Sequence, residues 1–135
     1  MVALATLAAS PFAVEAQSGK WVGTIAQMSG GGAADISVEP RGGDKSRARI
    51  TFRNAKGAIQ LAWDIVAGSC RDEGAPVAPQ PAFNQIQTQM DGGGSGTATI
   101  PKLESGKRYY VRVFDPQTAP TDAAAFGCAN LSEKP

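Results

Sequence analysis

The segment 57–70 constrains the fold of this chain most strongly, because its side chains alternate between two faces over its whole length. A period of two is typical of a β-strand with one face in a core, and Gln60 and Asp64 interrupt the apolar stripe that a helix would need. Cys70 follows this strand after the short turn 67–69. We expect a central strand whose inward face is formed by Ile59, Leu61, Trp63 and Ile65.

The composition favours a single domain built from short strands. A length of 135 residues suits one domain, and a hydrophobic fraction of 42% is enough for one core. The 16 glycines and 9 prolines, with only 19% charged residues, favour strands joined by turns over a helical bundle. The net charge of +1 does not indicate nucleic-acid binding. The absence of histidine removes the commonest general base and metal ligand.

Seven further segments have the pattern of strands, and glycine-rich or polar turns separate most of them. The loop after Cys70 contains three prolines, which excludes it from a sheet interior. Eight strands without an interior helix predict an all-β fold, an eight-stranded antiparallel Greek-key β-sandwich of the immunoglobulin-like kind. The seven segments are 20–28, 34–39, 46–53, 84–90, 97–100, 107–114 and 123–131.

Residues 1–16 form a short apolar run that ends in small residues, as a secretory signal does before its cleavage site. We interpret the run as a signal sequence cut before Gln17, which leaves 17–135 as a single β-sandwich domain. The positively charged start of a signal is missing, and the alternative is a short helix that stays attached. Pro11 interrupts the run, which is too short to span a bilayer. We expect a periplasmic or extracellular protein with no transmembrane span of its own.

The two cysteines, Cys70 and Cys128, form an even set in a chain that we expect to be exported. Such a set favours a disulfide bond, because exported proteins fold in an oxidising compartment. The alternative is a redox-active pair, which usually needs a Cys-x-x-Cys spacing or an activating base.

Three segments resemble the copper,zinc superoxide dismutases, especially their bacterial periplasmic branch. The strand 57–70 resembles the one that runs into a disulfide-forming cysteine in that family. The segment 85–100, with Asp-Gly at 91–92 and Gly-Thr-Ala-Thr-Ile at 96–100, resembles its Asp-Gly-x-Ala-Thr hairpin. Phe-Gly-Cys-Ala-Asn-Leu at 126–131 resembles its closing strand, which carries the second cysteine. The resemblance covers under half of the chain and implies a superoxide dismutase-like β-sandwich.

The departures from this family concern its metal site. The first two copper ligands of the family form a His-x-His on the central strand, and Asp64 and Val66 stand at the matching positions. The arginine that guides superoxide has no counterpart in the segment 123–126. A copper site that cycles between oxidation states needs imidazole or sulfur ligands. The resemblance therefore implies the scaffold without the activity, and we expect no cofactor, no metal and no catalysis.

Two strand faces carry residue types that are favoured at protein interfaces. Arg47, Arg49 and Arg53 share one face of the strand 46–53, and Arg108, Tyr110, Arg112 and Phe114 share one face of the strand 107–114. We predict that these seven residues bind a partner. The alternative is that they form the solvated faces of two strands.

The main functional hypothesis is a non-catalytic exported β-sandwich that acts as a binding or structural module. It would be an accessory or extrinsic subunit of a larger cell-envelope membrane complex, respiratory or photosynthetic, with a protein partner or peripheral contact with anionic lipid. The second hypothesis is an enzyme with a carboxylate metal site near Asp64. The third is a periplasmic small-ligand binder that uses the proline-rich loop.

Overall fold

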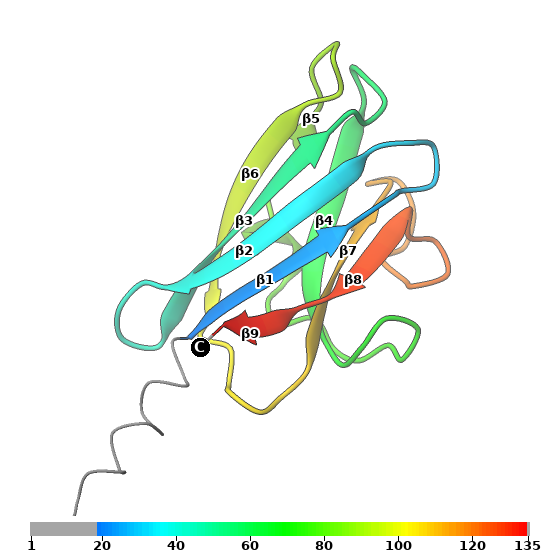
Figure 1. The fold of residues 1–135 in the computed structure, drawn as a ribbon. Coiled ribbons are helices and arrows are strands. Elements are labelled where there is room, and N and C mark those ends of the chain that lie inside the picture. Colours follow the sequence, from blue (N-terminus) through cyan, green and yellow to red (C-terminus); the bar gives the residue numbers. More distant parts are fainter. Residues whose placement is uncertain (1–18, 135) are drawn as a thin grey trace, which may run out of the picture.

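Strands with regular inward and outward side chains form two antiparallel sheets packed face to face (Figure 1). The structure, a computed structural model, describes residues 19–134. The prediction of an all-β sandwich is confirmed, whereas the signal sequence proposed for residues 1–16 lies outside the described residues. Among the described residues, no helix is long and apolar enough to cross a membrane.

The larger sheet has five strands in the order β6-β3-β2-β1-β9. Strand β3 alternates strictly, with Ala48, Ile50 and Phe52 buried and its arginines exposed, as the sequence predicts. One face of this sheet therefore packs on the core, and the other face is open. The strands are β1 (Lys20–Ile25), β2 (Ala33–Pro40), β3 (Lys45–Arg53), β6 (Gly94–Pro101) and β9 (Ser132–Lys134).

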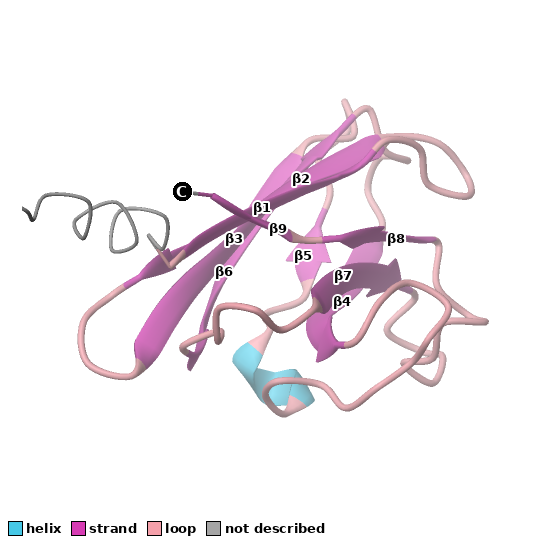
Figure 2. Cartoon of the chain, turned by 60° about the horizontal axis from the view of Figure 1, so that its bottom comes forward, coloured by secondary structure: helices cyan, strands magenta, loops and turns pink. Residues whose placement is uncertain are grey.

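The smaller sheet has four strands in the order β5-β4-β7-β8. Its two central strands are buried on both faces rather than on one. Figure 2 shows the reason, because loops lie on the side of β4 and β7 away from the larger sheet. The short 3-10 turn η1 (Gln80–Ala82) lies at the edge of the sandwich, where it also contacts β6. The strands are β4 (Gln60–Ala67), β5 (Ile86–Gln87), β7 (Tyr109–Phe114) and β8 (Gly127–Asn130).

Trp63 of β4 fills the centre of the core between the sheets and has no exposed surface. Its indole Nε1–H donates to the Asn84 carbonyl at 2.8 Å, and its ring meets Phe83 edge-on at 5.1 Å between centroids. Leu61 and Ile65 are buried on the same side, while Ile59 is partly exposed before β4 begins. The inward face predicted from the alternation is thus confirmed for β4.

The prediction of eight strands is wrong at the C-terminal end. Of the segment 123–131, only Gly127–Asn130 forms a strand, β8, which pairs with β7. The chain then crosses to the other sheet, where the unpredicted strand β9 pairs with β1. Leu131 marks the crossing and packs on Gly23, where a Cβ would lie 2.7 Å from the Leu131 side chain. The strand expected at 84–90 is also reduced, to Ile86–Gln87.

Replacing Trp63 by alanine is expected to lower the free energy of unfolding by about 3–5 kcal/mol, because the change opens a cavity between the sheets. The control is Met90→Ala, since Met90 is 87% exposed. That control should change the free energy by less than about 0.5 kcal/mol. Chemical denaturation measures both, and an unchanged midpoint for Trp63→Ala would contradict the inward register of β4.

Candidate functional site

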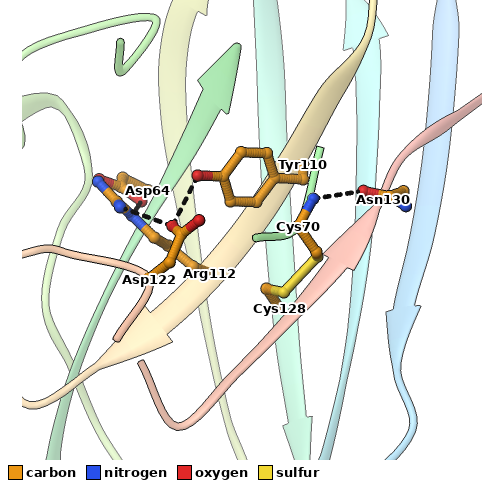
Figure 3. The surroundings of a disulfide bond; sticks show 7 residues. All are labelled: Asp64, Cys70, Tyr110, Arg112, Asp122, Cys128 and Asn130. Atoms are coloured by element: carbon orange, nitrogen blue, oxygen red, sulfur yellow. Dashed lines mark hydrogen bonds and ion pairs between the residues drawn. A yellow bond between two sulfur atoms is a disulfide. The ribbon is translucent and has the colours of Figure 1, made fainter. Parts of the chain in front are cut away.

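A buried ion pair joins the two central strands of the smaller sheet. Asp64 of β4 lies directly opposite Arg112 of β7 in the strand register. The guanidinium Nε–H donates to Asp64 Oδ1 at 2.8 Å, and an Nη2–H donates to Oδ2 at 3.1 Å (Figure 3). This two-point geometry is the strong form of the arginine–carboxylate contact. Both side chains are shielded from water, at 1% exposure for Arg112 and 0% for Asp64.

Residues of two loops, 68–85 after β4 and 115–126 after β7, complete the arrangement, which we call the Arg112 cluster. Asp122 Oδ1 accepts from Arg112 Nη1 at 3.0 Å and from the Tyr110 hydroxyl at 2.7 Å (Figure 3). Glu73 lies 3.5 Å from Arg112 Nη1 and accepts the Asp122 backbone N–H at 3.2 Å. Gln80 donates to Asp64 Oδ2 at 3.3 Å. The cluster therefore ties both loops to the sheet.

Three groups of the Arg112 cluster, Asp64, Tyr110 and Arg112, have pKa values above their ordinary ones. Burial raises the pKa of Asp64 and outweighs the opposite effect of its hydrogen bonds to Arg112. Burial also raises the pKa of Tyr110, and the bond to Asp122 adds to that increase. For Arg112, burial alone would lower the pKa, but Asp64 and Asp122 hold it above its ordinary value. Arg112 is therefore always charged.

The carboxylates of the cluster converge on Arg112 rather than on a shared metal position. Both oxygens of Asp64 are already bonded to the guanidinium. Within residues 19–134, no three histidine, cysteine, aspartate or glutamate side chains are grouped so that they could hold a metal ion. The arrangement as it stands is suited to fixing loops on a sheet.

The disulfide predicted between Cys70 and Cys128 is confirmed, with 6.0 Å between the two Cα atoms. It joins the loop after β4 to strand β8, on the same side of the sheet as the Arg112 cluster (Figure 3). The Cys70 backbone N–H donates to Asn130 Oδ1 at 2.8 Å and so fixes the same junction a second time. The proline-rich loop therefore begins at a covalent anchor.

The exposed face expected on the strand 107–114 is wrong for three of its four residues. Tyr110, Arg112 and Phe114 are buried, and only Arg108 is exposed. Sequence reasoning also missed Asp122 and the other loop partners of Arg112. The sequence held a signal for this burial. On the outer faces of β4 and β7, apolar residues flank the charged residues Asp64 and Arg112, which indicates a covered face. Those flanking residues are Ala62, Val66, Tyr110 and Phe114.

The three arginines of β3 all lie on the open face of the larger sheet, as predicted. Arg53 is paired, with its Nε 2.8 Å from Asp35 Oδ2, and hydrogen bonding to Arg53 lowers the pKa of Asp35. Arg47 and Arg49 form no ion pair with the described residues. We call these two residues the β3 arginine strip.

The surroundings of the β3 arginine strip are polar, with one apolar exception. In the register, Arg49 lies between Ser37 and Thr97, and Arg47 lies between Glu39 and Thr99. Glu39 is engaged elsewhere, 3.8 Å from Lys20. A shallow groove of about 310 Å³ runs beside Arg49 across β1, β2 and β3. Its lining includes Val22, Thr24, Ser37 and Thr51, of which Val22 is the exposed apolar residue.

The Asp64–Arg112 pair is expected to matter most when only one partner is removed. Asp64→Ala should lower the free energy of unfolding by about 3–5 kcal/mol, because it leaves a buried charge without its main partner. The double variant Asp64→Leu, Arg112→Met should recover at least half of that loss, since neither charge is then buried. Denaturation of both variants measures this. A double variant less stable than the single one would contradict the account.

Removing the disulfide is expected to lower the free energy of unfolding by about 4 kcal/mol, because it closes a long loop in the unfolded chain. The loop spans a separation of 58 residues. The measurement compares Cys70→Ser, Cys128→Ser with the wild type, with and without reductant. Reduced wild type should match the double variant. Two alkylatable thiols in wild-type protein isolated without reductant would contradict a formed disulfide.

The comparisons with known proteins give no family. No protein-family profile matches the chain, and neither a curated protein nor a solved structure matches it significantly. The family of this β-sandwich with one disulfide is therefore not identified.

Proposed function

We propose that this chain is a non-catalytic exported β-sandwich that docks, through the β3 arginine strip, on an acidic protein within a larger cell-envelope assembly. The observation that carries the proposal is the pair of adjacent exposed arginines without an ion pair among residues 19–134. Arginine is favoured at interfaces because its planar group forms several hydrogen bonds to a carboxylate.

The charge pattern of the larger sheet supports this face over others. Two like charges two residues apart on one strand repel each other weakly, and a sheet can avoid this with acidic neighbours. The chain does so for Arg53, which Asp35 neutralises. Arg49 has no acidic neighbour in the register, and Glu39, which lies opposite Arg47, pairs with Lys20 instead. An acidic partner would supply the missing carboxylates.

The groove beside Arg49 gives the proposed face a shape as well as a charge. Exposed Val22 offers an apolar contact at its edge, and hydroxyl groups of Ser37 and Thr51 line it. An interface that combines an apolar contact with charged hydrogen bonds is typical of specific protein association. The β3 arginine strip and this groove together form the proposed docking face.

The disulfide supports export, because such bonds persist in oxidising compartments and are rare in the cytosol. From the sequence we also propose that the larger assembly is respiratory or photosynthetic. In it the chain would be an extrinsic, accessory subunit.

The resemblance to the copper,zinc superoxide dismutases supports a scaffold without the enzyme. Two antiparallel sheets and a disulfide from the loop after the central strand to the closing strand are what that resemblance implies. Asp64, which matches a copper ligand of that family in the sequence, binds the guanidinium of Arg112. A side-chain cation thus neutralises the carboxylate, and both oxygens of Asp64 are bonded to that guanidinium.

The test is charge reversal on the proposed docking face. Arg47→Glu, Arg49→Glu should weaken association with the partner at least about tenfold and leave the thermal melting temperature unchanged. The matched control is Arg71→Glu, Lys107→Glu, which changes the net charge equally at two exposed cationic residues elsewhere. Co-purification from envelope membranes, quantified over increasing salt, measures the association.

Three outcomes would overturn the proposed face. The first is a strip variant that melts normally and co-purifies at wild-type yield. The second is a control that loses the partner instead. The third is binding to vesicles rich in anionic lipid, lost in the strip variant, with no protein partner retained.

A further inference from the structure

A hollow of about 290 Å³ lies at one end of the sandwich, away from the docking face and from the Arg112 cluster. It is formed where the turn between β1 and β2 meets the turn between β3 and β4, near the end of β7 (Figure 1). Its volume is at the lower limit of ordinary ligand sites, so it suits one small molecule rather than a lipid or a peptide.

The interior of the hollow is apolar. Met28 and Leu61 are buried residues of the core, and Ile59 and Phe126 are only partly covered. The end of the core is therefore partly open to solvent at this point. Apolar surface of this kind favours an apolar ligand group that displaces water from it.

The walls of the hollow are fixed before any ligand binds. The Phe126 backbone N–H donates to the Val113 carbonyl at 2.7 Å, and its carbonyl accepts from the Ser29 N–H at 2.8 Å. The Lys56 carbonyl accepts from the Thr88 hydroxyl at 2.6 Å. Asp115 Oδ1 accepts from the Gln117 N–H at 2.8 Å. A site that is already ordered loses little freedom when it binds.

Two opposite charges lie on the lining of the hollow and do not neutralise each other. Lys56 and Asp115 form no ion pair, with each other or with another described residue. Among residues 19–134, the Lys56 ammonium has no hydrogen-bond partner, and the Asp115 carboxylate accepts a hydrogen bond only at Oδ1. Both groups are therefore available to a ligand that carries the opposite charges.

The rim of the hollow at residues 29–31 carries little side-chain bulk. Gly30 and Gly31 have φ angles of 89° and 105°, a region that side-chain-bearing residues rarely adopt. A Cβ placed on either residue would meet no atom within 4 Å. The rim at this turn is therefore bare backbone beside open space, and a ligand can enter past it.

We propose that this hollow binds a free apolar α-amino acid, with its side chain in the apolar interior. Its carboxylate pairs with Lys56 and its ammonium group with Asp115. Leucine and phenylalanine have the matching combination of an apolar side chain and two adjacent opposite charges. A ligand with only one charge would leave the other rim residue unused, and glycine would leave the apolar interior unfilled.

The test is a titration of ¹⁵N-labelled protein with L-leucine and L-phenylalanine, followed by NMR. Saturable shifts are expected for amides at 28–31, 55–61 and 126. Glycine, N-acetyl-L-leucine, L-leucinamide and uncharged 3-methylbutan-1-ol should each bind at least about tenfold more weakly than L-leucine.

Variants of the two rim charges give the sharper test. Lys56→Met and Asp115→Asn should each weaken leucine binding about tenfold, while Asp115→Asn keeps the acceptor for the Gln117 N–H. The matched controls Lys102→Met and Asp44→Asn, at the other end of the sandwich, should bind as the wild type does. The proposal is overturned if leucine gives no saturable shifts. Equal binding of 3-methylbutan-1-ol, or wild-type affinity in both rim variants, would also overturn it.

Discussion

An arginine cannot be placed inside a β-sandwich without a fixed partner, because a buried unpaired charge costs several kcal/mol. Arg112 satisfies this condition through Asp64, the residue directly opposite on the neighbouring strand. Their contact also needs a cover that excludes water, and the loops on either side supply it. The outer face of β4 and β7 is therefore buried, and the positions of the loops that cover it follow from this burial.

The cover is built from several independent contacts. Asp122 and Glu73 bring one loop to the other, and each also contacts Arg112. The Val77 N–H donates to the Ile65 carbonyl at 2.9 Å, so the proline-rich loop runs along the edge of β4. The disulfide at Cys70 fixes the start of that loop. Polar contacts of this kind specify one arrangement of the loops more than they add stability. The proposed docking face on the larger sheet and the end hollow both lie away from this closed face.

The sequence predicted those strands in which one face is buried and the other is exposed to solvent. Strand β3 alternates strictly, and the buried Trp63 and the exposed Arg47 both follow from period and residue type. The same rule failed on β7, where it placed Arg112 in solvent. A period of two separates the faces of a strand but does not say which faces are covered by distant loops. The crossing at Leu131 was missed for a similar reason, because it depends on contact with Gly23.

The central claim is that the Arg112 cluster holds the two loops closed over the smaller sheet. Amide hydrogen exchange on the variant Asp64→Leu, Arg112→Met tests it most directly. The account predicts fast exchange at Asp122, whose N–H donates to Glu73, with unchanged protection in the core around Trp63. Wild-type protection at Asp122 in a folded variant would contradict it, because the loops would then be closed without the cluster.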